Sequence, residues 1–307
     1  MQILLEQGYS LNKLLTHVCL AKSSFYYKPE EGYRGKKPSS QTFDKNGNAY
    51  SNTYVIEWIE WLLNQEFIDY GYKKVTTWLS KKQGFSINQK KVYRLMKESN
   101  LLNHRFKRDQ QAKRRVSKFQ PQPEEPFEAM QTDLKFIHIH GQNRNALLAT
   151  ILDVYSRGAL GYRFHWRINK QVIRDLMEEV RINYQLPEEV CLRTDNGSQF
   201  EAKLFREYLA SKKITHEFTY ASTPEQNAFI EAFHSIVQNA FCEKYEFDSI
   251  QQADKKLSEF MNFYNQERIH GRLGNESPNN FLRNREKPHK LRLFPCSEFQ
   301  VCGASQN

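Results

Sequence analysis

A stretch in the middle of the chain alternates between apolar and polar residues. Met130, Leu134 and Phe136 fall on one side of an extended segment, and Asp133 and Lys135 fall on the other. A period of two is the signature of a β-strand whose faces meet different surroundings. The pattern predicts a strand that carries Asp133 in the middle of a sheet.

Similar patterns on both sides of this stretch predict strands followed by helices. The residues from Gly141 to Asn145 supply a turn for a first hairpin. We expect strands near residues 127–139, 145–153, 158–166, 190–194 and 214–218, and helices near residues 169–184 and 200–211 and from residues 224 and 250. This order predicts an α/β fold in which helices cover a mixed sheet.

An amphipathic helix is predicted over residues 89–97. Val92, Leu95 and Met96 recur at helical spacing, and Ser86 or Asn88 can cap the start of the helix. The opposite side carries the basic residues Lys90, Lys91, Arg94 and Lys97. Such a helix fits a DNA major groove as the second helix of a helix-turn-helix, and it equally fits the solvated face of an ordinary amphipathic helix.

Three acidic residues stand in distinctive local sequences. Asp133 lies in the strand described above, Asp195 precedes an Asn-Gly turn, and Glu231 lies in a helix that begins near Pro224, with Thr223 as its N-cap. Hard divalent cations prefer oxygen ligands, and two Mg²⁺ ions about 4 Å apart serve both the attacking and the leaving oxygen in phosphoryl transfer. The three carboxylates are a candidate site for two such ions, although each one alone is explained as well by a place on the surface.

The sequences around these carboxylates resemble the catalytic domain of integrase-like DDE transposases of the bacterial insertion sequence 3 (IS3) family. Asp195 and Glu231 are separated by 35 residues in this chain. The segments that carry the resemblance are residues 70–75, 88–96, 130–137, 152–157, 161–162, 192–200, 223–233 and 263–270, with Leu273, Ser277 and Pro278. The resemblance runs in order from about residue 53 to residue 282.

The resemblance implies a ribonuclease-H-like catalytic domain, with a five-stranded mixed sheet, preceded by an all-α helix-turn-helix region. It implies a transposase in which Asp133, Asp195 and Glu231 hold two Mg²⁺ or Mn²⁺ ions. The implied reaction cleaves a strand at the element's end and transfers the freed 3′ hydroxyl to another phosphate. Implied partners are double-stranded DNA (terminal inverted repeats and target), further copies of the chain in a homo-oligomer, and a DNA-binding protein from an upstream frame. Copying through a circular intermediate is implied as well.

Three further residues are expected beside the carboxylates. Asn227 and His234 lie about one turn before and after Glu231 on the same helix face and would line the site, and a packed imidazole explains His234 equally well. Relatives usually carry Lys or Arg seven residues after the glutamate. This chain has Gln238 there, which puts one expected contact with a DNA phosphate in doubt.

The net charge of +10 comes from the first part of the chain. Residues 1–125 hold 22 Lys and Arg against 12 Asp and Glu, whereas the remainder holds 23 of each. A basic first part suits a polyanionic partner. The densest run includes Arg105, Lys107, Arg108, Lys113, Arg114 and Arg115, which are candidate DNA contacts.

Composition and the family resemblance together imply five parts of the chain. These are a short helical segment with a flexible linker (1–52), a helix-turn-helix region (53–104), a basic Pro-containing linker (105–125), the catalytic core (126–285) and a C-terminal tail (286–307).

The five scattered cysteines contain no C-x-x-C pair, which predicts reduced thiols and no zinc site. No apolar run is long enough to span a bilayer, so we expect a cytoplasmic protein that associates with the bacterial nucleoid when bound to DNA. Three other functions compete with transposition. They are a nuclease that cuts without joining, a domesticated DNA-binding protein with a silent catalytic domain, and a recombinase that forms a covalent bond through a tyrosine such as Tyr264.

Overall fold

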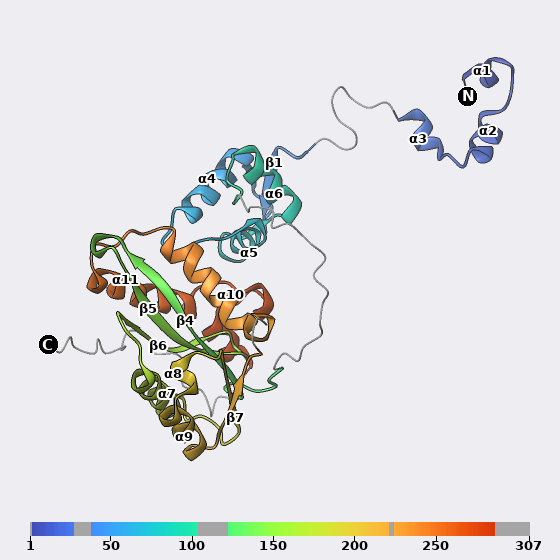
Figure 1. Cartoon of the computed structure of the whole chain (residues 1–307). Helices are drawn as coiled ribbons and strands as arrows, with labels where there is room; N and C mark the ends of the chain where they lie inside the picture. Colours follow the sequence, from blue (N-terminus) through green and yellow to red (C-terminus); the bar gives the residue numbers. More distant parts are fainter. Residues whose placement is uncertain (1, 28–37, 104–121, 221–223, 286–307) are drawn as a thin grey trace.

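The computed structural model describes residues 2–27, 38–103, 122–220 and 224–285 (Figure 1). The expected basic run after residue 104 and the expected C-terminal tail lie outside these ranges.

A five-stranded mixed sheet forms the centre of the second half of the chain. Its strands are β4 (Ala129–Ile139), β5 (Arg144–Asp153), β6 (Ala159–His165), β7 (Val190–Thr194) and β8 (Ile214–Phe218). Their order is β6-β5-β4-β7-β8, with antiparallel pairing among β4, β5 and β6 and parallel pairing of β4 with β7 and of β7 with β8. The predicted mixed sheet is confirmed. Phe136, expected on the apolar side of β4, is 66% exposed.

Helices cover both faces of this sheet (Figure 1). One layer holds α7 (Lys170–Tyr184), α8 (Ser198–Glu201) and α9 (Lys203–Ser211). The other holds α10 (Ala228–Val237), a π-helical extension (Gln238–Cys242) and α11 (Ile250–Gln266). Gly161 on β6 lets α7 approach closely, because an added Cβ would lie 2.9 Å from a methyl carbon of Val180. Short 3₁₀ turns stand at His140–Gln142, Pro224–Asn227 and Gly271–Leu273, and α12 (Pro278–Arg285) closes the described chain.

A smaller helical unit precedes the sheet domain. It contains α4 (Asn52–Leu63), α5 (Tyr72–Lys82) and α6 (Gln89–Glu98), and it packs against β1 (Gln41–Asp44), β2 (Ala49–Ser51) and β3 (Phe85–Ser86), which pair in the order β2-β1-β3. The predicted helix over residues 89–97 is confirmed. Val92, Leu95 and Met96 are buried, and the Asn88 side chain accepts a hydrogen bond from the backbone N–H of Lys91.

The flexible linker expected within residues 1–52 is wrong for residues 41–51, where the chain forms a β-hairpin. The Asp44 carboxylate accepts hydrogen bonds from the backbone N–H groups of Asn46 and Asn48, and Gly47 has a φ of +88°. Turn-forming residues dominate the composition here because they build a hairpin loop. The region that was expected to be all-α therefore also contains a small sheet.

Three short helices lie at the start of the chain: α1 (Gln2–Glu6), α2 (Leu11–His17) and α3 (Lys22–Tyr26). No helix in the described ranges is long and apolar enough to cross a membrane.

The loop between α4 and α5 joins the helical unit to the sheet domain. Phe67 packs into the core beneath α10 and α11, whereas Tyr70 packs into the core of the helical unit. Asp69, between them, forms an ion pair with Arg268, whose side chain is 1% exposed. The two units therefore share a buried joint.

Candidate active site

Three different elements supply the three predicted carboxylates. Asp133 lies on β4, Asp195 directly follows β7, and Glu231 lies in the first turn of α10. Because β4 and β7 are neighbouring strands and α10 packs on β4, the topology directs the three residues to one place. Asp195 is held in a turn in which its Oδ1 accepts the backbone N–H of Gly197 at 3.1 Å.

Electrostatics link the three groups. Burial raises the pKa of Asp133 to about 6, the hydrogen bond from the backbone N–H of Leu134 opposes this shift, and the charges of Asp195 and Glu231 add to it. The arrangement thus gathers negative charge around a partly desolvated carboxylate.

A buried glutamine anchors the helix that carries Glu231. Gln131 on β4 is 0% exposed, and its Oε1 accepts the backbone N–H groups of Phe229 and Ile230 at 3.1 and 3.0 Å. Its Nε2 donates to the Gln226 carbonyl at 3.2 Å. Free N–H groups at a helix start need such acceptors. The sequence analysis did not identify Gln131, although a polar residue two positions before Asp133 in an apolar strand was a usable signal.

Arg193 on β7 gives a second anchor to the same turn. Its Nη1 donates to the Gln226 carbonyl at 3.0 Å, and its other nitrogens pair with Glu217 on β8. The start of α10 is therefore fixed to both β4 and β7, and through Glu217 to β8. This residue was also missed by the sequence analysis.

The predicted neighbours of Glu231 take different positions. His234 Nδ1 lies 3.7 Å from Asp133 Oδ2, and burial together with the charge of Lys135 lowers the pKa of the imidazole to about 4. Asn227 is 5% exposed and immediately precedes α10. Gln238 begins the π-helical extension, and its Oε1 accepts a hydrogen bond from Lys135 Nζ at 2.9 Å.

The donor set fits hard divalent cations by its chemistry. All three groups are carboxylates, and a cation would relieve the repulsion and desolvation that raise the pKa of Asp133. Within the described ranges, no three His, Cys, Asp or Glu side chains stand close enough together to hold a metal ion. Asp133 and Asp195 are half-buried, whereas Glu231 is exposed.

Several residues in the segments that resemble the transposase family form hydrogen bonds within the fold. Asp153 is fully buried and accepts hydrogen bonds from Phe127 and Ser156. The Asn265 side chain accepts a hydrogen bond from the backbone N–H of Ala159 on β6 and donates one to its carbonyl. Tyr264 is 1% exposed and its hydroxyl donates to the Arg157 carbonyl at 2.8 Å, which leaves it unsuited to attack a phosphate.

The predicted DNA-binding residues fall into three groups. Lys90 and Lys97 are exposed on α6. Lys91 and Arg94, on the same helix, donate hydrogen bonds to residues 39–41 and are partly covered. Arg105, Lys107, Arg108, Lys113, Arg114 and Arg115 lie outside the described residues.

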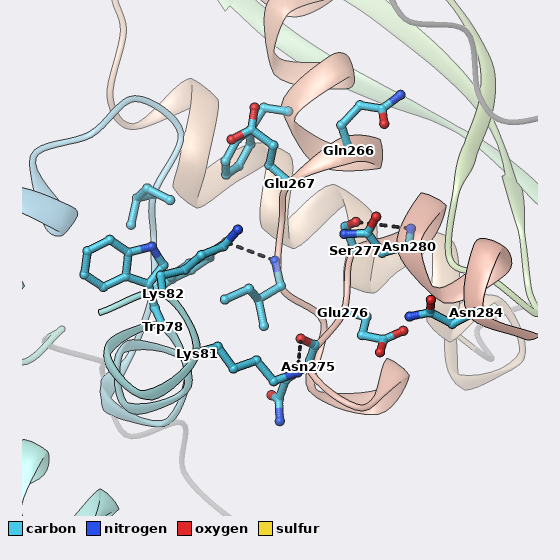
Figure 2. Close-up of a pocket in the computed structure, with 14 residues that line it drawn as sticks. Trp78, Lys81, Lys82, Gln266, Glu267, Asn275, Glu276, Ser277, Asn280 and Asn284 are labelled. Atoms are coloured by element: carbon cyan, nitrogen blue, oxygen red, sulfur yellow. Dashed lines mark hydrogen bonds between the residues drawn. The ribbon is translucent and has the colours of Figure 1, made fainter. Parts of the chain in front are cut away.

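A separate cavity of about 430 Å³ lies at the joint between the two units (Figure 2). Trp78, Lys81 and Lys82 from α5 face the turn after α11, and Lys81 Nζ donates to the Asn275 carbonyl at 3.3 Å. None of the three carboxylates lines it. It belongs to the joint between the units and is distinct from the candidate active site.

Models of known domain families match most of the described chain. Two models described as an integrase core domain match residues 123–224 and 212–278, and a model described as an HTH-like domain matches residues 57–108.

Relatives from insertion elements match over longer stretches. The chain is 27% identical over 217 residues to an uncharacterized 39.2 kDa protein of IS476 from Xanthomonas euvesicatoria, covering 70% of this chain and 61% of that protein, which is less than two thirds of its length. It is 23% identical over 288 residues to the putative transposase InsK for IS150 from Escherichia coli K12, covering 89% and 94%. It is 28% identical over 233 residues to the transposase InsD for IS2 elements from Escherichia coli, covering 72% and 75%.

Among solved structures, the catalytic core domain of HTLV-2 integrase is 16% identical, with a TM-score of 0.39 over 51% of this chain and 96% of that one. The integrase-core matches cover the sheet domain, the HTH-like match covers the helical unit, and the named relatives are transposases of IS150 and IS2. The chain therefore contains an integrase core domain preceded by an HTH-like domain.

Proposed function

We propose that this chain is a DNA transposase that cleaves a strand at the ends of its insertion sequence and joins the freed 3′ hydroxyl to another phosphate. The observation that supports it best is the convergence of Asp133, Asp195 and Glu231 from two neighbouring strands and a helix within an integrase-core fold. Bound divalent cations, Mg²⁺ or Mn²⁺, would supply activation of the attacking oxygen and stabilisation of the leaving oxygen.

The chain's own residues position this chemistry. Asp133, Asp195 and Glu231 would hold the ions, while Gln131 and Arg193 fix the start of the helix that carries Glu231. His234, with its lowered pKa, stays neutral at pH 7 and adds no charge beside Asp133. Asn227 and Gln238 complete the lining.

We assign the helical unit (53–104), with the basic segment after it (105–125), to gripping double-stranded DNA, and residues 126–285 to catalysis. Residues 1–52 and 286–307 flank these parts. Lys90 and Lys97 are the exposed basic residues of α6 that are available to phosphates, because Lys91 and Arg94 bond residues 39–41. Pairing two element ends requires at least two copies of the chain, so we infer a homo-oligomer on DNA. A partner protein from an upstream frame remains part of the proposal.

The test uses the purified chain and a duplex oligonucleotide that carries the terminal repeat found beside its gene. With Mg²⁺ or Mn²⁺, the wild type should yield both cleaved and joined products. Asp195→Asn should reduce both at least about a hundredfold, the scale on which one charge-stabilising group acts, without weakening DNA binding. Robust activity in Asp195→Asn would contradict the assignment.

Asp175→Asn is the matched control, because Asp175 is a half-exposed carboxylate of α7 that pairs with the adjacent Arg174. It should leave both products unchanged. Cleavage without joining by the wild type would indicate a nuclease, and DNA binding with neither product would indicate a domesticated DNA-binding protein.

A further inference from the structure

Side chains from one face of β4 contact successive positions of α10 and its extension. Asp133 Oδ2 lies 3.7 Å from His234 Nδ1, and Lys135 Nζ, two residues further along the strand, donates to Gln238 Oε1 at 2.9 Å. Residues two apart on a strand share a face and stand about 7 Å apart along it. Lys135 is therefore the neighbour of Asp133 on the face that meets the helix.

The charge of Lys135 has no acidic partner among the residues that the structure describes. The acceptor of its hydrogen bond is a neutral amide, and no ion pair within 4.0 Å involves it in those ranges. An ammonium group has three N–H donors, and this contact uses one. The side chain is half-buried, so a cation is held at the edge of an acidic site with donors left for another acceptor.

A DNA phosphodiester has the negative charge and the acceptor oxygens that suit the ammonium group of Lys135. A substrate that reacts beside Asp133 carries a phosphate on each neighbouring nucleotide, and contacts from lysine to phosphate oxygens commonly fix the register of DNA on a protein. Carboxylates repel a DNA backbone, so a cation beside them offsets part of that repulsion.

We propose that Lys135 binds a DNA phosphate next to the reacting one and that Gln238 holds the ammonium group of Lys135 in place. The inference rests on the proposed function, since it assumes DNA bound at the three carboxylates. It makes Lys135 and Gln238 one binding unit, in which the cation is carried by the strand and the neutral partner by the helix.

The arrangement predicts that the two residues tolerate an exchange. Lys135→Gln removes the charge, and Lys135→Gln with Gln238→Lys returns it from the helix across the same contact. Lys135→Arg keeps the charge at its original place. Lys203→Gln is the matched control, because Lys203 is an exposed residue of α9 that pairs only with Glu207 among described residues.

The measurement is the affinity of each variant for duplex DNA with the terminal repeat, without metal, across a salt series. Lys135→Gln should reduce the slope of log affinity against log salt by about 0.9, so that raising the salt from 50 to 200 mM costs about 3.5-fold less affinity than in the wild type. The exchanged variant and Lys135→Arg should restore the slope, and Lys203→Gln should match the wild type.

An unchanged slope in Lys135→Gln, or an exchanged variant that behaves like Lys135→Gln, would overturn the inference. Thermal unfolding of each variant shows that these slopes come from folded protein. If the wild type binds and joins the ends while Lys135→Gln keeps its slope, the inference alone fails. If the wild type yields no cleaved product with metal, the proposed function fails.

Discussion

Among single residues, buried polar side chains fix the geometry of the site. Gln131 and Arg193 both bond the turn before α10, and the first of them also accepts the two N–H groups at its start. Neither residue carries out chemistry. They determine where Glu231 stands relative to Asp133, because the helix start can move only if these bonds break.

Gln131→Ala should therefore affect both stability and activity. It leaves two N–H groups at the start of α10 without their acceptor, which costs about 1–3 kcal/mol, and it frees the helix that carries Glu231. We expect strand cleavage to slow while affinity for DNA stays close to that of the wild type. The measurements are urea unfolding and cleavage rate at saturating DNA.

Gln252→Ala is the control for that change. Gln252 Oε1 also accepts a backbone N–H near a helix start, from Asp248 at 2.8 Å, but it is exposed and lies on α11. The control should lose less stability and keep its cleavage rate. Equal cleavage rates for the two variants would show that Gln131 does not position Glu231.

Strands and helices were predicted well where one periodic pattern was long. β4 and α7 lie within about two residues of the expected ends, and α11 begins at the expected residue, because each element buries apolar residues in the cores. The hairpin of residues 41–51 was missed because its stability comes from pairing with β3 and packing against α4, which local composition does not encode. The π-helical turn at Gln238 was missed for a similar reason, since sequence spacing assumes regular helix geometry.

The candidate site was predictable in its parts and less so in its arrangement. Asp133, Asp195 and Glu231 stand in distinctive segments, so local sequence was enough to propose them as the site. Contacts between distant residues decided the rest. Lys135 contacts Gln238 across 103 positions of sequence, and no local pattern on either element predicts that contact.

The pair of β7 and β8 should make stability depend on pH. Nε2 of His216 on β8 lies 3.0 Å from Oγ1 of Thr194 on β7. Burial, together with the charge of Arg206, lowers the pKa of the His216 imidazole from 6.5 to about 4. Between these values the unfolded chain binds a proton at His216 and the folded chain does not. Stability therefore falls as the pH drops from 6.5 toward 4.

Asp133 changes the free energy of unfolding in the opposite direction over this pH range, because its pKa rises from 3.8 to about 6 on folding. Comparing the wild type with His216→Gln cancels that contribution. The free energy of unfolding, measured by urea at several pH values, should fall more steeply for the wild type over this window. Parallel curves would show that His216 is not buried in its neutral form.

At the scale of the whole molecule, one loop couples the helical unit to the catalytic domain. Arg268 Nη2 lies 2.7 Å from Asp69 Oδ1 and donates to Oδ2 at 2.9 Å, and the Tyr70 hydroxyl accepts the backbone N–H of Ile269. Lys244 and Lys256 add contacts to the same loop. DNA gripped by the helical unit would thus keep a fixed position relative to the three carboxylates.

Asp69→Asn should break this coupling, because it leaves the guanidinium of Arg268, 1% exposed, without its counter-charge. Removing one partner of a buried pair costs about 3–5 kcal/mol.

Glu66→Gln is the matched control on the same loop, since Glu66 pairs with Lys256 while 62% exposed, and an exposed pair contributes less than about 1 kcal/mol. In urea, Asp69→Asn should lose the larger free energy of unfolding and separate the transitions of the two units. Equal losses in the two variants, with a single transition in each, would mean that the buried pair does not join the units. Strand joining should fall in Asp69→Asn even at temperatures where both units remain folded, because the helical unit no longer presents its DNA to the carboxylates in one fixed orientation.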